Sequence, residues 1–162
     1  MPVLNAEDIK EELKKGELVI KPLTEDQIGP ASVDLRIGNQ FRIFRRSEIT
    51  SIDLKKDMDL EIMELVEKPD DKPFVIHPGQ LIISNTMEYV KMPVHLAGRL
   101  DGRLKWGKLG IVIQSASGYI QPGYEGQLTL SITNTAPVPI KLWPGLKVCQ
   151  LILRTVGCSA DK

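Results

Sequence analysis

The chain has 162 residues, and 21 Lys and Arg balance 21 Asp and Glu, so its formal net charge is zero. Without a net field it has no long-range attraction for nucleic acid or an anionic membrane, and an anionic ligand must be held by a local cluster of cations. No apolar run approaches the ~20 residues that cross a bilayer, and the N-terminus lacks the apolar core of a signal peptide. We therefore expect a cytoplasmic protein with no nucleic-acid or membrane partner, forming one domain over residues 1–162.

The cysteine and histidine content argues against a fold held together by disulfide bonds or by a structural metal ion. Cys149 and Cys158 are the two cysteines; no CxxC pair occurs, and only two histidines accompany them. This usage predicts neither a disulfide framework nor a structural zinc site. We expect two incidental thiols.

Residues 5–16 carry the pattern of a helix. Asn5 is a good N-cap, and Glu7 and Asp8 suit the positive end of the helix dipole. Gly16 is a natural stop after the last turn. We expect a short helix that covers one end of a sheet.

Beyond this helix the pattern is that of short strands. Val33, Leu35 and Ile37 alternate with polar residues, which has the period of a strand, and residues 41–44 continue as a second short strand. Residues 45–72 are charged and irregular, so we expect a surface excursion there, with room for one strand.

Three Pro-Gly pairs separate the later apolar runs. Proline presets the first central dihedral of a turn and glycine accepts a positive φ at the next, so each pair favours a type II turn. Short strands at this spacing indicate a sandwich or a barrel-like roll. The pairs are residues 78–79, 122–123 and 144–145.

One strand can be assigned face by face. Leu128, Leu130 and Ile132 point one way and are expected in the core. The residues between them, including Ser131, are expected to face solvent, a cavity or a neighbouring subunit.

A basic, glycine-rich segment follows the middle strands. Arg99, Arg103, Lys105 and Lys108 lie within ten residues among closely spaced glycines. Glycines let backbone N–H groups approach an anion, and Lys and Arg supply charge, so the segment can bind a triphosphate. A solvated basic turn fits the same spacing.

Four segments resemble the dCTP deaminase/dUTPase family, in the family's order and near its spacing. IGPASVDLRIGN is similar to the Pro-x-Ser-Val-Asp-Leu-Arg opening of dCTP deaminases, and LAGRLDGRLKWGKLGI to the run that ends Gly-Arg-Ser-Ser-Leu-x-Arg-Leu-Gly. SGYIQPGYEGQLTLSITN is similar to Ile-Asp-Pro-Gly-Tyr-x-Gly-x-Ile-Thr-Leu-Glu-x-x-Asn, and IKLWPGLKVCQLIL to the closing strand. The opening block is closer to deaminases than to simple dUTPases. The segments are residues 28–39, 96–111, 117–134 and 140–153.

The resemblance implies an all-β fold, a distorted β-roll or jelly-roll-like sandwich of the dUTPase type with one short N-terminal helix. It also implies a homotrimer with active sites between subunits, a pyrimidine deoxynucleoside triphosphate (dCTP or dUTP) as ligand, and Mg²⁺ carried by the phosphates, with no protein-held metal. Members deaminate dCTP to dUTP, hydrolyse dUTP to dUMP and pyrophosphate, or do both.

The resemblance also implies roles for individual residues. Arg103, Lys105, Lys108 and Gln150 would bind phosphates, and Gln121 would hold the sugar. Tyr119 is a ligand contact or a loop anchor, and Trp106 a base-stacking or a packed side chain; both alternatives stay open.

The departures from the family pattern fall on the chemistry. Ser131 stands where deaminases have the general-base Glu, and an unassisted hydroxyl cannot accept a proton from water at neutral pH. Gln121 stands where the family has Asp; an amide can bind a hydroxyl but cannot act as a base. Leu104 and Lys105 replace a Ser-Ser pair, Lys108 replaces Arg, and we expect the family's C-terminal arm over the phosphates to be missing.

Three hypotheses follow, and the residues alone leave them open. The chain is an enzyme of pyrimidine deoxynucleotide metabolism with a modified mechanism, a non-catalytic trimeric nucleotide-binding or regulatory module, or a structural trimer without a ligand. Asp101, Glu125 and His95 are the remaining candidate bases, and each fits an exposed turn residue or a structural partner better.

Overall fold

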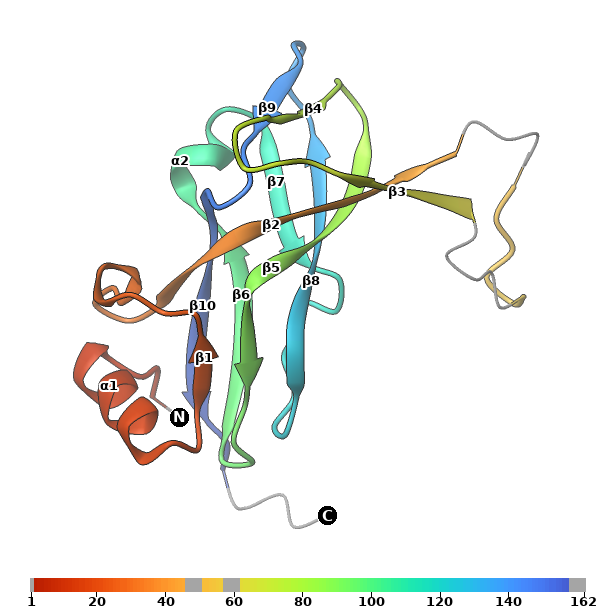
Figure 1. The fold of residues 1–162 in the computed structure, drawn as a ribbon. Helices are drawn as coiled ribbons and strands as arrows, with labels where there is room; N and C mark the ends of the chain where they lie inside the picture. Colours follow the sequence, from red (N-terminus) through yellow and green to blue (C-terminus); the bar gives the residue numbers. More distant parts are fainter. Residues whose placement is uncertain (1, 46–50, 57–61, 158–162) are drawn as a thin grey trace.

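Six strands of the computed structural model, which describes residues 2–45, 51–56 and 62–157, close into a ring (Figure 1). Around the ring the order is β5, β8, β7, β6, β10 and β2, and β2 pairs back onto β5. β1 extends the sheet beyond β5, β3 extends it beyond β2, and β4 and β9 form a separate two-stranded sheet. The predicted all-β roll is therefore confirmed.

The elements in chain order are α1 (Ala6–Lys15), β1 (Val19–Lys21), the 3-10 turn η1 (Glu25–Gln27), β2 (Val33–Phe44), β3 (Met63–Glu67), β4 (Phe74–Ile76), β5 (Leu81–Lys91), β6 (Leu96–Gly102), α2 (Leu104–Gly107), β7 (Ile111–Ser115), β8 (Glu125–Asn134), β9 (Ile140–Leu142) and β10 (Lys147–Thr155). Neither helix is long and apolar enough to cross a membrane, as far as the described residues go.

Helix α1 forms where its caps predict it. The Asn5 side chain accepts hydrogen bonds from the N–H groups of Glu7 and Asp8, at 2.8 and 3.0 Å. Gly16 ends the helix with φ 78°, a left-handed conformation that glycine adopts without strain. Ile9 is fully buried, so the helix packs on the body of the protein, beside β1 in Figure 1.

The two strands expected around residues 33–37 and 41–44 are one strand, β2. Its pairing with β5 shifts register between Ile37 and Phe41, so the strand bends there and does not end. Gly38 permits the close approach, since a Cβ at this position would lie 3.1 Å from the carbonyl oxygen of Asn85. The expected excursion over 45–72 contains β3; residues 46–50 and 57–61 lie outside the described part.

The inside of the ring is apolar, and along β8 apolar side chains that point inward alternate with polar side chains that point outward. Leu128, Leu130 and Ile132 are at most 3% exposed, and the residues between them face outward, as predicted. The glycines of the three Pro-Gly pairs have φ between 75° and 81°, as the predicted turns require. The outer face of the ring thus carries polar side chains at known positions along each strand.

Candidate functional site

A polar row crosses the outer face of the ring. Ser131 on β8 pairs with Gln114 on β7, which pairs with Asp101 on β6. Asp101 pairs with Gln150 on β10, and Gln150 with Asp34 on β2. Directly paired residues point to the same face of a sheet, so these five side chains form one row, and each is at least partly exposed.

No acid stands beside Ser131 in this row. Its register partners are Gln114 on one side and Ile83 on β5 on the other. The first carboxylate along the row is Asp101, two strand spacings or about 10 Å away, and its side chain accepts a hydrogen bond from Arg99 Nε at 3.2 Å. The Ser131 hydroxyl therefore has no neighbouring base in the sheet to draw off its proton.

A cavity of about 810 Å³ opens along the middle of the row. Asp101 and Gln114 line it from the strands, and Tyr119 lines it from the loop between β7 and β8. Arg99 and Arg154 add positive charge to the same walls. This cavity connects the row to the loop that carries Tyr119 and the predicted sugar contact, Gln121.

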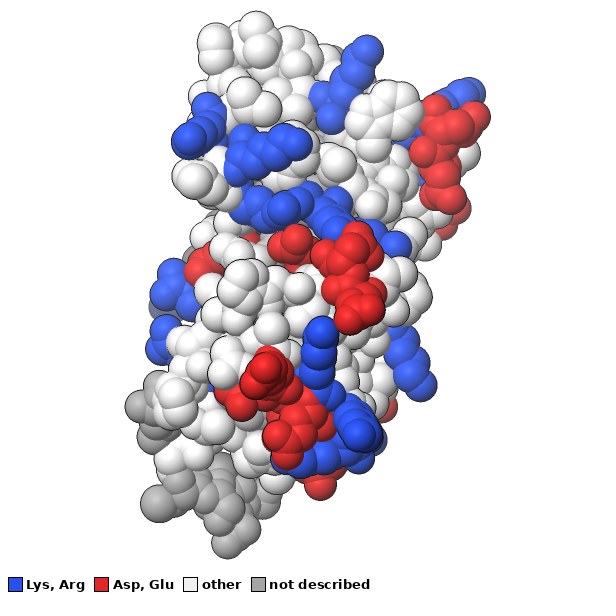
Figure 2. All heavy atoms as spheres, turned by 90° about the vertical axis from the view of Figure 1, so that its left-hand side faces the viewer, with Lys and Arg blue, Asp and Glu red and all other residues white. Residues whose placement is uncertain are grey.

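The cations predicted to bind phosphate cluster at α2. Arg103 immediately precedes this helix, and its Nη2 lies 3.5 Å from Asp34 Oδ2. Lys105 Nζ lies 4.8 Å from the centre of the Trp106 ring, and Lys108 is exposed at the end of the helix. In Figure 2, Lys and Arg side chains gather over the upper part of this face, above a group of Asp and Glu. A locally basic surface thus exists on a chain of zero net charge.

Trp106 anchors α2 to the ring. Its indole N–H donates to the carbonyl oxygen of Lys147 at 2.8 Å, and its ring packs against the core. The Lys147 ammonium in turn lies 2.6 Å from a carboxylate oxygen of Asp26. Within the chain Trp106 is thus a packed side chain, held by its hydrogen bond to Lys147 and by its contact with the core.

The fold buries a carboxylate that the sequence patterns missed. Glu88 on β5 is fully buried and accepts from Arg36 Nε at 2.7 Å and from the Arg36 backbone N–H at 2.9 Å. Gln27 Nε2 donates to Glu88 at 3.0 Å and to the Asp34 carbonyl at 2.8 Å. This network holds η1 and β2 together, and β2 carries the Asp34 that contacts Arg103.

Gln150 has a single side-chain partner among the described residues. Its Oε1 accepts a hydrogen bond from Ser32 Oγ at 3.2 Å, which leaves its amide N–H groups available to a ligand.

The loop between β7 and β8 carries Tyr119 and Gln121, both exposed. Ser117 Oγ donates to the Tyr119 carbonyl at 2.7 Å, and the Gln121 carbonyl accepts from the Tyr124 N–H at 3.2 Å, so backbone contacts shape the loop and leave both side chains free to meet a ligand. Beneath it lies a cavity of about 200 Å³, lined by Ser115, Ala116, Ser117, Tyr119, Ile120, Tyr124, Leu128 and Thr129.

The cationic cluster and this loop lie at opposite ends of β7. The five residues of β7 span about 16 Å. Within one chain, therefore, a single small group cannot touch Lys108 and Gln121 together.

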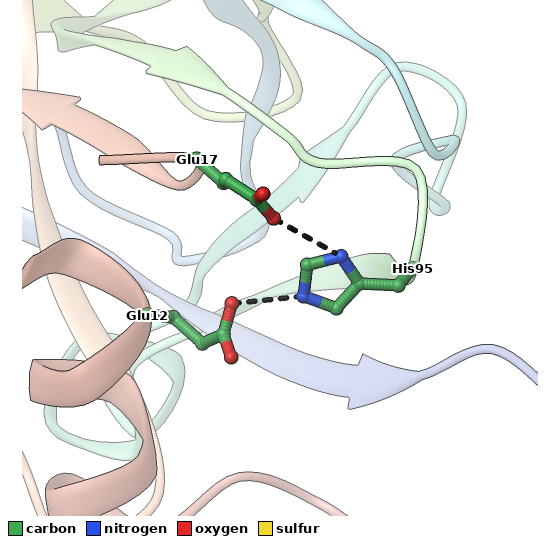
Figure 3. Close-up of side chains that lie close together, drawn as sticks. All are labelled: Glu12, Glu17 and His95. Carbon is green, nitrogen blue, oxygen red and sulfur yellow. Dashed lines mark hydrogen bonds and ion pairs between the residues drawn. The ribbon is translucent and has the colours of Figure 1, made fainter. Parts of the chain in front are cut away.

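The other candidate bases form ion pairs or hydrogen bonds away from the row. His95 lies between Glu12 (2.8 Å from Nε2) and Glu17 (3.6 Å from Nδ1), at one end of the ring (Figure 3). Glu125 accepts a hydrogen bond from the Tyr89 hydroxyl. Within the described residues, Glu12, Glu17 and His95 form the one group of three metal-ligating side chains, and it does not include the row.

Comparisons with known proteins agree with the fold and the motifs. The family model described as dCTP deaminase-like matches residues 3–156. The dCTP deaminase, dUMP-forming, of Corynebacterium diphtheriae is 45% identical over 146 residues, which are 90% of this chain and 78% of that protein. The protein of the same name from Methanosphaera stadtmanae is 43% identical over 164 residues, 100% of this chain and 83% of that protein.

Solved structures share the architecture at lower identity. The 2′-deoxycytidine 5′-triphosphate deaminase of Agrobacterium tumefaciens superposes with TM-score 0.73 and 24% identity, over 95% of this chain and 48% of that chain, so this chain spans about half of its length. The EIAV dUTPase superposes with TM-score 0.56 and 19% identity, over 90% of this chain and 93% of that one. At these identities the likeness concerns the fold, and it confirms the dUTPase-type roll.

Proposed function

Since the chain belongs to the dCTP deaminase-like family, we propose that it binds a pyrimidine deoxynucleoside triphosphate, with the phosphates on the outer face of the ring and the base in the cavity beneath the β7–β8 loop. We further propose that it deaminates dCTP at least ~10²-fold more slowly than a relative that has a general base at position 131.

The observation that carries this proposal is the surroundings of Ser131. Its register partners, Ile83 and Gln114, cannot accept a proton at neutral pH. Loss of one general base costs ~10²–10⁴ in rate, and no neighbouring side chain substitutes for it in the row. The chain thus has the fold of the family but has Ser131 in place of the general-base Glu.

The cluster at α2 is the proposed phosphate site. Arg103, Lys105 and Lys108 present three positive charges on a short stretch of backbone, and the free amide of Gln150 is the neighbouring donor on β10. Asp34 offsets part of the Arg103 charge in the free protein. A triphosphate would replace that carboxylate as the partner of the guanidinium.

The separation along β7 supports a site shared between copies of the chain. Strand β7, about 16 Å long, separates the α2 cluster from the loop that carries Gln121, so we propose that the cluster of one copy and the loop of another hold the same nucleotide. We propose a homotrimer in which Gln121 contacts the sugar, Tyr119 covers the base, and the 200 Å³ cavity receives a single pyrimidine ring.

Magnesium fits only as a companion of the phosphates. The side chains near Arg103 are cations and amides, and the carboxylates Asp34 and Asp101 already contact Arg103 and Arg99. These residues do not form a protein-held Mg²⁺ site. A structure of the phage phi11 dUTPase from S. aureus describes a structural Mg(II) ion, and its identity to this chain is 17%.

Hydrolysis of dUTP to dUMP is the second candidate, favoured by the dUMP-forming relatives. Gln121 stands where the family has an Asp that activates water. An amide there can bind the sugar hydroxyl but cannot accept a proton. We therefore expect dUTP hydrolysis, like deamination, to be slower than in a relative with Asp at this position.

The test separates binding from turnover. Calorimetric titration with dCTP and dUTP, with dATP as the comparison, should show pyrimidine-specific binding, while ammonia and pyrophosphate release stay low at high enzyme concentration. Ser131→Glu combined with Gln121→Asp should recover deamination. Thr133→Glu, an acid two residues along on the same face, is the matched control and should not. Turnover by the unaltered chain at a relative's rate would refute the reduced-turnover claim, and absence of nucleotide binding would refute the function.

A further inference from the structure

The Ser115 hydroxyl has no hydrogen-bond partner. Among the described residues it is the one buried side-chain oxygen or nitrogen in this condition, and Ser115 is only 6% exposed. Other buried hydroxyls on this scaffold are paired with backbone carbonyls: Ser84 Oγ with Gln40 at 2.7 Å, and Thr86 Oγ1 with Glu88 at 2.8 Å. An unpaired buried hydroxyl is destabilising, and a ligand that reaches it can supply the missing partner.

Ser115 lies where such a partner would arrive. It is the last residue of β7, its side chain points to the same inner face of the ring as its register partner Leu130, and it lines the 200 Å³ cavity under the β7–β8 loop. The neighbouring Tyr124 hydroxyl is already committed to the Gln127 carbonyl at 2.6 Å. The Ser115 oxygen is shielded from solvent in the free protein, but a turn about the Cα–Cβ bond reorients it without moving the strand.

Resting on the function proposed above, we propose that Ser115 is the residue that lets this cavity accept both cytosine and uracil, through a hydrogen bond from its hydroxyl to the polar edge of the base. Cytosine and uracil differ along that edge: one offers an amino donor where the other offers an oxo acceptor. A hydroxyl both donates and accepts, so one side chain fits either base by rotation of its O–H bond. An amide or a charged group in one fixed orientation would favour one base over the other.

The first variant is Ser115→Ala, measured in calorimetric titrations with dCTP and with dUTP and in thermal melts without nucleotide. We expect binding of both nucleotides to weaken by a similar factor, about tenfold. We expect the melting temperature of the free protein to stay level or to rise by about 2–4 °C, because an unpaired hydroxyl is removed. A purely structural hydroxyl would lower the melting temperature.

Ser115→Thr and Ser115→Val are the matched pair, since they have nearly the same shape and differ in the hydroxyl. The Thr variant should bind both nucleotides more tightly than the Val variant. Equal binding by these two, undiminished binding by the Ala variant, loss for only one base, or a lowered melting temperature of the free Ala variant overturns the inference while the proposed function stands. If the unaltered protein binds neither nucleotide, the proposed function fails and takes the inference with it.

Discussion

Replacing Glu88 with glutamine removes a charge that the protein encloses completely. Two donors, Arg36 Nε and Gln27 Nε2, meet one oxygen of the carboxylate, and the Arg36 backbone N–H meets the other. Glutamine keeps one acceptor oxygen and gains an NH₂ group, which must face at least one of these three donors. The Arg36 guanidinium also loses the negative charge that balanced it. Breaking a buried ion pair from one side costs about 3–5 kcal/mol. Since the Arg36 side chain is 21% exposed and can be partly hydrated, we expect about 3 kcal/mol for Glu88→Gln.

Urea unfolding at fixed protein concentration measures this loss of stability. An unchanged m-value, the slope of the unfolding free energy against urea concentration, would show that both proteins expose the same surface on unfolding. Glu25→Gln is the matched control, because Glu25 also pairs with a cation, Lys10 at 3.2 Å, but on the surface. That control should leave the midpoint almost unmoved. A loss below about 1 kcal/mol for Glu88→Gln would mean that the network relaxes or admits water, and the reasoning from buried charge would be wrong.

Three further outcomes are expected. Gly110→Ala should destabilise by about 1–3 kcal/mol in urea unfolding, because the residue has φ 93° and a Cβ would lie 2.8 Å from the Ala136 backbone nitrogen; a neutral result would contradict this. Burial raises the pKa of Glu12, but its hydrogen bonds and ion pairs, with His95 first, outweigh burial and hold that pKa below its ordinary value of 4.5. The ionised carboxylate therefore stabilises the fold above pH 4.5, and this stabilisation is lost as the pH falls through the lowered pKa. Glu12→Gln should make the free energy of unfolding depend less on pH in that range. Burial raises the pKa of the Cys149 thiol far above its ordinary value, so a thiol reagent followed by peptide mass spectrometry should label Cys149 only after unfolding.

Local patterns predicted the fold well where a few residues decide the geometry. Asn5 and Gly16 bound the helix because their own side-chain and backbone chemistry does so. The patterns were wrong where pairing between strands decides: two short strands were predicted at residues 33–37 and 41–44, but pairing with β5 continues through a bend and makes them one strand, β2. Helix α2 was not anticipated, because four residues are too few for a periodic signal and its anchor is the distant carbonyl of Lys147.

For the candidate site, the sequence predicted residue types but not their neighbours. Arg103 stood out as a cation among glycines, whereas its contact with Asp34 joins residues far apart in the chain. Glu88 sits in an ordinary strand pattern, and only the fold shows that this position is enclosed. The unpaired hydroxyl of Ser115 could not be predicted from the sequence either, because the lack of a hydrogen-bond partner depends on how the surrounding residues pack.

The last strand, β10, lies between β6 and β2 in the ring. During synthesis on the ribosome, every earlier strand is made while this gap is still open, so the barrel cannot seal until residues 147–155 have emerged. Until then β2 and β6 present unpaired backbone edges that can associate with other chains. Nascent chains of this protein should therefore depend on chaperones until residues 147–155 have emerged, and shortening β10 should harm solubility more than shortening α1.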